Sequence, residues 1–344
     1  MEEQNLIKRI LDIKKEFGEK LVILTHHYQR RAVFALGDYG GDSFELSRKA
    51  SLDKAAQFIV FCGVHFMAES AEILSRPHQI VQIPDLNAGC PMADMADIAD
   101  VEKAWGEVIA ISGKNSVTPV VYMNAAATIK DFCGRNGGIV CTSSNTPAAF
   151  AWSFKRRGKI FFFPDQHLGR NTGNKMGIKP DQMILWNSDE PLGGNTAESI
   201  NNAQIILWNG FCHVHTEFKV DNIRQMKEKY PDSKIVVHPE CPQEVVEFSD
   251  AAGSTSFIVK YVEEASPGST IIIGTEFNLI DRLAAEYKDK KILPLYESIC
   301  PNMYKIDLKK LLWSLENIGK VNVIKVPETI KKGAKVALDR MLAL

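Results

Sequence analysis

Short apolar runs alternate with amphipathic helical patterns along almost the whole chain. After an amphipathic first helix, apolar runs of strand length occur at residues 21–25, 58–64 and 80–84, with helical patterns between them. Alternation of this kind predicts parallel strands joined by helical crossovers. The sequence therefore predicts an α/β fold.

The same order of elements occurs three times. Each pass reads strand with a polar end, helix, serine- or threonine-bearing turn, helix, strand, helix, strand and finally a cysteine. We therefore expect three similar α/β/α sandwich domains with parallel sheets, related by pseudo-threefold symmetry around a central active site. The expected units span residues 1–105, 106–218 and 219–305, and the tail, 306–344, is expected to pack back on the body. One large doubly wound sheet is the alternative.

One segment departs from this repeated order. Residues 171–203 are rich in glycine and asparagine and have no counterpart in the other two units. A long insertion of this composition is typical of a functional loop. We expect it to form a loop or a lid.

Composition excludes several classes of protein. The 344 residues carry a net charge of −1, so nucleic acid and anionic membranes are not expected as main partners. No stretch approaches the ~20 apolar residues of a membrane span. The charged N-terminal helix lacks the apolar core of a signal peptide, and the odd number of cysteines, seven, fits reduced thiols. These features indicate a cytoplasmic protein.

Three of the seven cysteines occupy equivalent places. Cys90, Cys212 and Cys300 each follow the last strand of a unit, so three thiols are expected to meet at one point. Cys62, Cys133 and Cys141 are interpreted as packing residues, and Cys241 as a neighbour of the site. Three thiolates without a fourth suit an iron–sulfur cluster with one open iron, or zinc with His213 or His215 as the fourth ligand. Spacing alone leaves both metals open.

Polar residues gather where strands end and helices begin. Those after the first strand of a unit are His26, Tyr28, Tyr122, Asn124, His238 and Glu240. Ser43, Ser143 and Thr255 lie in the turn before the next helix, where such residues usually act as N-caps. Three helix starts facing one axis also form an anion site, which suits a small substrate with carboxylates or phosphate. A His, a Tyr and a Glu beside it could move protons.

The motifs that carry these residues resemble one family over almost the whole chain. They are, in order, LTHHYQ, GDS, GVHFMAE, AGCPMA, YMN, CTSSN, PDQHLG, GFCHVH, VHPECP, GSTS, GTEFNLI and CPNM. Together they resemble quinolinate synthase, the NadA family of NAD biosynthesis. The resemblance implies three α/β domains and a [4Fe-4S] cluster held by Cys90, Cys212 and Cys300. It also implies condensation of iminoaspartate with dihydroxyacetone phosphate to quinolinate, releasing phosphate and two waters.

The resemblance also implies individual roles. The substrate-binding positions carried over by motif are His26, Ser43, Tyr122, Asn124, Ser143, His238, Glu240 and Thr255. Glu240, Tyr122, His26 and His238 are the candidates for acid/base catalysis, and the open iron would act as a Lewis acid. An aspartate oxidase or dehydrogenase is the implied source of iminoaspartate. His167 stands in PDQHLG where the family pattern has Asn, and the C-terminal ligand motif carries a single cysteine.

Other functions remain compatible with parts of the pattern. A different cluster-dependent hydro-lyase would use the same open iron on another hydroxy acid. An iron–sulfur or zinc sensor would need a basic element for nucleic acid, which the charge disfavours. A zinc hydrolase could be built on His213 and His215, but HVH lacks a third ligand at helical spacing.

Overall fold

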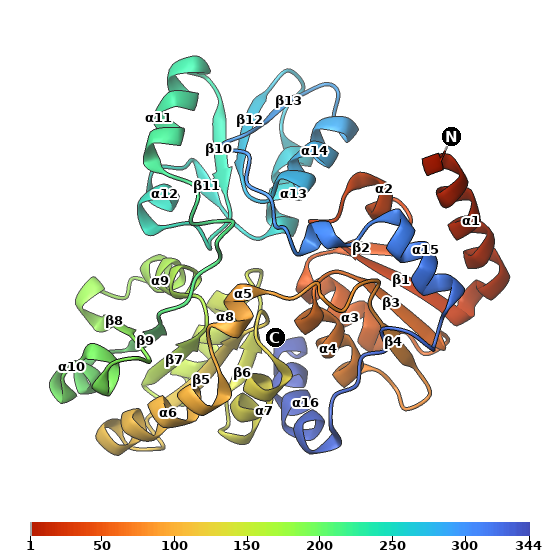
Figure 1. Cartoon of the computed structure of the whole chain (residues 1–344). Helices are drawn as coiled ribbons and strands as arrows, with labels where there is room; N and C mark the ends of the chain where they lie inside the picture. The colour runs from red at the N-terminus through yellow and green to blue at the C-terminus, as the bar shows by residue number, and fades with distance from the viewer. Residues whose placement is uncertain (1) are drawn as a thin grey trace. The chain divides into compact units, whose positions relative to one another are not determined.

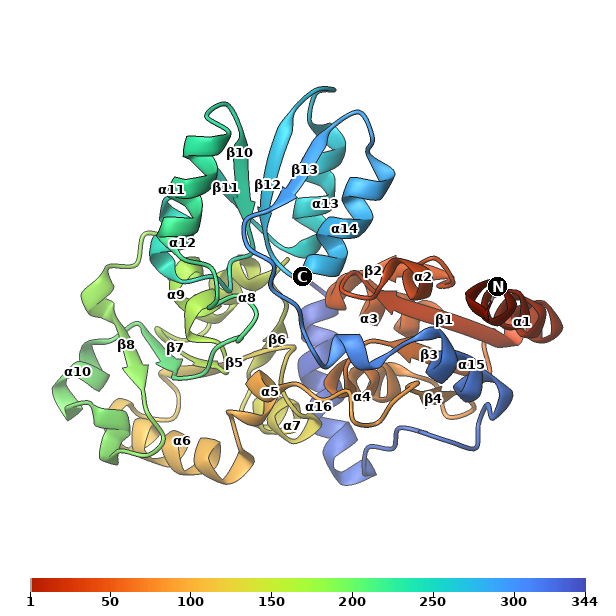
Figure 2. The same ribbon diagram turned by 45° about the horizontal axis from the view of Figure 1, so that its top comes forward.

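The computed structural model describes residues 2–344 and contains three parallel β-sheets flanked by helices (Figures 1 and 2). The expected α/β class is therefore confirmed. Among the described residues, no helix combines the length and the apolar character needed to cross a membrane.

The first sheet has the strand order β2-β1-β3-β4. Its strands are β1 (Leu21–His26), β2 (Tyr39–Gly41), β3 (Phe58–Cys62) and β4 (Ile80–Gln82). The helices of this region are α1 (Glu2–Phe17), α2 (Arg31–Phe34), α3 (Ser43–Leu52) and α4 (His65–Leu74), with a 3₁₀ turn, η1, at Gly18–Lys20. All six residues of β1 are buried, as expected for a central parallel strand covered on both faces.

The second sheet has five strands in the order β6-β5-β7-β9-β8. They are β5 (Val117–Tyr122), β6 (Ile139–Cys141), β7 (Lys159–Phe163), β8 (Met183–Trp186) and β9 (Ile205–Trp208). The helices are α5 (Pro91–Asp94), α6 (Ile98–Ser112), α7 (Ala127–Arg135), α8 (Thr146–Phe154), α9 (Gln166–Lys175) and α10 (Ala197–Asn202), with 3₁₀ turns η2 (Pro180–Gln182) and η3 (Pro191–Gly194).

Strand β8 corrects the expectation for residues 171–203. Instead of an open loop, this segment adds an edge strand that pairs in parallel with β9, and it ends in helix α10. A role as a lid stays a prediction. The apolar run Met183–Trp186 is the signal that the glycine- and asparagine-rich composition around it concealed.

The third sheet has the order β11-β10-β12-β13. Its strands are β10 (Lys234–Val237), β11 (Ala251–Ala252), β12 (Thr270–Gly274) and β13 (Lys291–Pro294). The helices are α11 (Val220–Lys229), α12 (Gln243–Glu247), α13 (Thr255–Glu264) and α14 (Phe277–Glu286). The C-terminal part holds η4 (Met303–Lys305), α15 (Leu308–Glu316) and α16 (Glu328–Leu342).

By contact density the chain divides into two compact bodies. The first body comprises the described residues up to Cys90 together with Asp221–Val236 and Ser254–Val326, and the second comprises Pro91–Val220, Val237–Gly253 and Pro327–Leu344. In the first body α15 packs against α1, and in the second α16 packs against α7 (Figure 1). Each sheet has its strands within one of the three ranges expected from the sequence. The domain boundaries themselves stay predictions.

Two glycines allow α7 and α16 to pack closely. A Cβ atom on Gly134 would lie 1.9 Å from the carbonyl oxygen of Gly333, and a Cβ on Gly333 would lie 2.0 Å from Asp131 Oδ1. Both distances are far below van der Waals contact, and the first involves backbone that cannot rotate away. The contact between α7 and the C-terminal helix therefore requires glycine on both sides.

Replacing Gly134 with alanine should therefore lower stability. The added methyl group forces the two helices apart, and overpacking of this kind costs about 1–3 kcal/mol, which outweighs the better helix propensity of alanine. Gly106→Ala is the matched control, because Gly106 lies in α6 with nothing within 4 Å of its added Cβ. That control should gain about 0.5–1 kcal/mol. Urea denaturation measures the free energy of unfolding of both variants. Equal changes in the same direction would contradict this account.

Candidate functional site

The most strongly connected group of predicted residues lies around Glu240 in the second body. Glu240 follows β10 in the turn His238-Pro239-Glu240 and is only 3% exposed. The Tyr122 hydroxyl, at the end of β5, donates to Glu240 Oε1 over 2.5 Å. His215 Nδ1 lies 2.6 Å from Glu240 Oε2, and His238 Nδ1 lies 3.8 Å from the same oxygen. Three predicted residues, Tyr122, His238 and Glu240, are thus brought together.

The surroundings of Glu240 keep its carboxylate ionised. Burial raises the pKa of Glu240, but the nearby His215 and His238 and the hydrogen bond from Tyr122 outweigh burial and lower the pKa to about 2. The rings of His215 and His238 stack with centroids 4.5 Å apart. Glu240 is therefore a buried carboxylate that stays ionised at neutral pH.

A second carboxyl group beside Glu240 has the opposite tendency. Asp165, the N-cap of α9, is fully buried and accepts from the Leu168 backbone N–H over 2.7 Å. Burial, and then the charge of Glu240, raise the pKa of Asp165 well above its ordinary value. Two neighbouring carboxyls with pKa values moved apart are the usual arrangement of an acid and a base. The sequence analysis had not singled out Asp165, although its motif PDQHLG was recognised.

Asn171 supports the turn that carries Glu240. Its side-chain amide, on α9, donates to the carbonyl oxygens of Pro239 and Cys241, each over 2.8 Å. Asn171 also lines a cavity of about 420 Å³ together with the predicted residue Ser143. His167 lies in the first turn of α9, and burial lowers the pKa of its imidazole.

Asn124 offers an unused hydrogen-bonding group two residues beyond the end of β5. Its Oδ1 is buried and has no hydrogen-bond partner among residues 2–344. The next residue, Ala125, is held through its carbonyl oxygen by the fully buried Lys130 over 2.7 Å. A buried acceptor without a partner costs free energy unless a ligand or water satisfies it, so Asn124 fits a binding role.

In the first body, His26 and Ser43 lie at the same sheet edge. His26 is the last residue of β1 and pairs with Gly41, the last residue of β2. Its Nδ1 accepts from the backbone N–H of Tyr28 over 3.2 Å. Helix α3 begins at Ser43, two residues after Gly41. The parallel pairing therefore places the start of α3 beside the end of β1.

Ser43 and Thr255 are not the caps of their helices. The side chain of Asp42 caps α3 by accepting from two backbone N–H groups, and Ser254 caps α13 by accepting from Phe257 N over 3.3 Å. Ser256 Oγ lies 2.9 Å from Glu45 Oε2 and joins the two helix starts. For α8 the N-cap position is Asn145, two residues after Ser143. The N-cap interpretation is thus wrong for all three predicted hydroxyls.

The hydroxyls of Ser43 and Thr255 are consequently not needed for capping. Neither makes a side-chain hydrogen bond to another residue in the part of the chain that the structure describes. Each lies at the first position of its helix, where backbone N–H groups and the helix dipole favour anions. This geometry supports the predicted binding of carboxylate or phosphate.

Burial separates the seven cysteines into two groups. Cys90, Cys212 and Cys300 are half-buried, whereas Cys62, Cys133, Cys141 and Cys241 are buried. Burial raises the pKa of Cys62 and of Cys141 to about 12, and it also raises the pKa of Cys133 and Cys241. Burial and a raised pKa favour packing over metal binding for these four thiols, and Cys241 lies next to Glu240 in the chain.

The loops of Cys90 and Cys300 are tied together within the first body. Lys305 Nζ, five residues after Cys300, donates to the carbonyl oxygen of Asn87 over 2.7 Å. The two sulfur-bearing loops are therefore joined by a direct contact. Soft sulfur donors in accessible loops fit an iron–sulfur cluster.

The structure also places His215 beside Glu240, a proximity that the sequence analysis did not predict. Ligand atoms of Cys212, His215 and Glu240 lie within 4.8 Å of one another, so this group could hold a metal ion. His215 was considered only as a zinc ligand, yet it is paired with Glu240. The spacing of GFCHVH, which puts His215 three residues after Cys212 in one turn, was the signal for this proximity.

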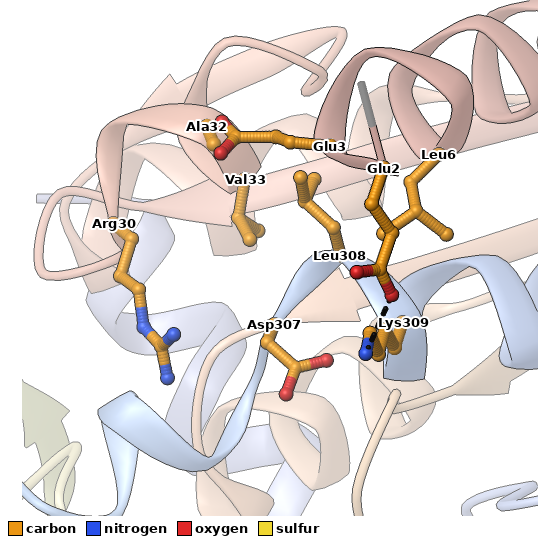
Figure 3. A pocket seen from close by; sticks show the side chains of 9 residues that line it. All are labelled: Glu2, Glu3, Leu6, Arg30, Ala32, Val33, Asp307, Leu308 and Lys309. Carbon is orange, nitrogen blue, oxygen red and sulfur yellow. Dashed lines mark ion pairs between the residues drawn. The ribbon is translucent and has the colours of Figure 1, made fainter.

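A separate cavity in the first body contains none of the predicted residues. It has a volume of about 530 Å³ and lies between α1, the segment after β1 and the start of α15 (Figure 3). Glu2 and Lys309 form an ion pair of 2.8 Å at its edge, and Arg30 and Asp307 also line it. Its charges are mixed and exposed, so it is not the candidate site.

Comparisons with known proteins agree with the resemblance seen in the motifs. A family model described as "NadA: Quinolinate synthetase A protein" matches residues 8–343. A quinolinate synthase of Corynebacterium glutamicum is 49% identical over 347 residues, which cover 99% of this chain and 88% of that protein. Those of Bacillus cereus (46% identical; 99% and 94% covered) and Rhodopirellula baltica (45%; 100% and 92%) are similar over comparable lengths.

Next to the predicted residue His26, His27 is held in its neutral form. Arg282 Nη2 lies 3.0 Å from His27 Nδ1, and because a guanidinium can only donate, this nitrogen must be unprotonated. The ring stacks on Phe34 with centroids 5.7 Å apart. Burial, followed by the charges of His26 and Arg282, holds the pKa of His27 well below its ordinary value of 6.5.

The free energy of unfolding should therefore fall as the pH drops below about 6.5, where the unfolded chain gains a proton that native His27 does not bind. For one such group, the free energy of unfolding changes with pH by at most ~1.4 kcal/mol per pH unit. His27→Asn keeps an acceptor for Arg282 but cannot titrate, so it should reduce the fall between pH 7.5 and 5.5 in urea denaturation. The exposed His78→Asn serves as the control and should retain the wild-type slope. Equal slopes for wild type and His27→Asn would contradict the assignment.

Proposed function

The chain belongs to the quinolinate synthetase A (NadA) family, and we propose that it acts as a quinolinate synthase in NAD biosynthesis. The observation that carries the proposal is the buried group of Tyr122, His215, His238 and Glu240, which lies at strand ends within a full-length family match. A buried carboxylate paired with two imidazoles and a phenol is suited to proton transfer rather than to packing.

The proposed reaction condenses iminoaspartate with dihydroxyacetone phosphate and releases phosphate and two waters. A C–O bond breaks when each water and the phosphate leave. The site must therefore protonate the departing oxygens and remove protons from carbon or nitrogen. Iminoaspartate is unstable in water, and an aspartate oxidase or dehydrogenase is the proposed source of it. We place the enzyme in the cytoplasm, among the transferases.

The proposed cofactor is a [4Fe-4S] cluster held by Cys90, Cys212 and Cys300. The accessibility of these three thiols and the burial of the other four support the ligand set. The cluster would supply a Lewis-acidic iron without a protein thiolate, able to bind a substrate oxygen.

The side chains divide the remaining work by their chemistry. Glu240, held ionised, accepts a proton, and Tyr122 donates or accepts through its short hydrogen bond to Glu240. His26 and His238 hold or protonate oxygens that carry or leave with charge. Asn124 offers its buried amide to the substrate, and Ser43, Ser143 and Thr255 bind carboxylate or phosphate.

Replacing a ligand cysteine should remove the cluster without unfolding the protein. Cys300→Ser, purified anaerobically, should lose the brown colour and the broad absorption near 400 nm that [4Fe-4S] clusters give. It should also form no quinolinate from the two substrates. Cys62→Ala is the control, because Cys62 is buried within β3 and should keep wild-type iron and sulfide content. A wild-type protein that is colourless and binds one zinc would reject the proposed cofactor.

Removing the charge of Glu240 should affect catalysis rather than cluster binding. Glu240→Gln should lower kcat by ~10²–10⁴-fold, the usual contribution of a general acid or base. Tyr122→Phe should also lower kcat, since it removes the hydroxyl that donates to Glu240. Glu244→Gln changes an exposed carboxylate in α12 and should retain full activity. Near-normal kcat in Glu240→Gln with an intact cluster would exclude the proton-transfer role.

A further inference from the structure

Glu276 is a buried carboxylate to which the proposed function assigns no role. It follows β12, caps the N-terminus of α14 and is fully buried. A buried carboxylate requires hydrogen-bond donors around it. The identity of those donors indicates what Glu276 holds in place.

One of the donors is the backbone of a proposed cluster ligand. Cys300 N–H donates to Glu276 Oε1 over 3.3 Å. Next to it, the Phe277 backbone N–H donates to the carbonyl oxygen of Ser298 over 2.9 Å. The start of α14 therefore makes two hydrogen bonds to this loop, one to the backbone of Ser298 and one to the backbone of Cys300.

Further donors come from Asn278. Its backbone N–H donates to Glu276 Oε2 over 2.8 Å, and its side-chain amide donates to Oε1 over 2.9 Å. The same amide reaches the carbonyl oxygen of Tyr28 over 3.3 Å. The Tyr28 hydroxyl in turn lies 2.8 Å from Thr275 Oγ1. Residues 275–278 thus form hydrogen bonds to Tyr28, which lies two residues after His26, the last residue of β1.

The segment after β1 also contacts the turn that follows Cys300. The buried Gln29 amide donates to the carbonyl oxygen of Met303 over 3.3 Å. The Arg30 guanidinium lies 3.8 Å above the ring of Tyr304 and donates to the carbonyl oxygen of the same residue. The chain on both sides of Cys300 is therefore held by hydrogen bonds within the first body: Ser298 by α14, and Met303 and Tyr304 by the segment after β1.

We infer that Glu276 is a positioning residue that fixes the backbone of Cys300 and, through Asn278, joins it to the segment that begins at His26. The inference rests on the proposed function, since it takes Cys300 as a cluster ligand. Loading of the cluster and the position of a substrate-binding histidine are then mechanically linked. Hydrogen bonds that orient a metal ligand commonly change metal affinity by ~10–100-fold when they are removed.

Side-chain length separates this role from ordinary capping. Aspartate is among the best N-cap residues, so Glu276→Asp should preserve the cap of α14. Its carboxylate, however, is shorter by one C–C bond of ~1.5 Å. Because the bond to Cys300 N already spans 3.3 Å, the shorter side chain cannot reach it. The variant therefore removes the hydrogen bond to the Cys300 backbone and keeps the cap of α14.

The test compares wild type, Glu276→Asp and the control Asp97→Glu. The control makes a change of one methylene at the N-cap of α6, where no cysteine follows. In iron-free protein, amide hydrogen exchange of the peptide covering residues 295–304 should be faster in Glu276→Asp, with thermal stability close to wild type. After reconstitution, loss of iron to a chelator should be ~10-fold faster. The control should match wild type in both measurements.

Exchange and iron loss at wild-type rates in Glu276→Asp would overturn the inference. Should that variant fail to fold, Asn278→Ala provides the second test, because it keeps the backbone N–H and removes the amide. It should speed exchange of residues 27–30 in iron-free protein, and an unchanged rate would equally overturn the inference. A wild-type protein that binds no iron would instead contradict the proposed function. If the wild type binds iron and Glu276→Asp matches it in amide exchange and in iron loss, only the positioning role is refuted.

Discussion

Two buried glutamates, Glu240 and Glu276, impose a strict local requirement on this chain. A buried carboxylate destabilises the fold unless donors surround it, and supplying those donors fixes the position of every residue that provides one. Around Glu240 the donors are side chains, Tyr122 and His215. Around Glu276 they are mainly backbone N–H groups, including that of Cys300. The first arrangement positions reactive groups, and the second positions a loop.

The same difference in donors gives the two carboxyls different protonation behaviour. Burial raises the pKa of both, but the imidazoles beside Glu240 reverse the effect and lower its pKa to about 2. Glu276 has uncharged amide donors, which only partly offset burial, and its pKa is raised to about 7. A glutamate is thus made a base or a structural anchor by the charge of its neighbours rather than by burial.

Parallel sheet architecture explains why these residues occur where they do. Strands β1 and β5 are buried along their length and β10 is buried from Ile235 on, and most of their residues are apolar. The acid/base candidates come at or just beyond the carboxyl ends of these strands. His26, Tyr122 and His238 occupy that position in the three sheets. Helices α3 and α13 begin near such ends, with Ser43 and Thr255 at their first positions. Strand ends can therefore hold both the proposed acid/base groups and the proposed anion-binding groups without disturbing the core.

The sequence alone determined the α/β class, most of the strands, the three equivalent cysteines and the polar strand ends, because these follow from local periodicity and from chain order. It did not reveal β8 within a polar segment, nor that Asp42 and Ser254 cap helices next to Ser43 and Thr255. Only the tertiary structure decided that His215 faces Glu240 and that Glu276 holds Cys300. These contacts join residues 24 or more positions apart, up to 118 for Tyr122 and Glu240, and no local pattern specifies which distant donor will satisfy a buried carboxylate.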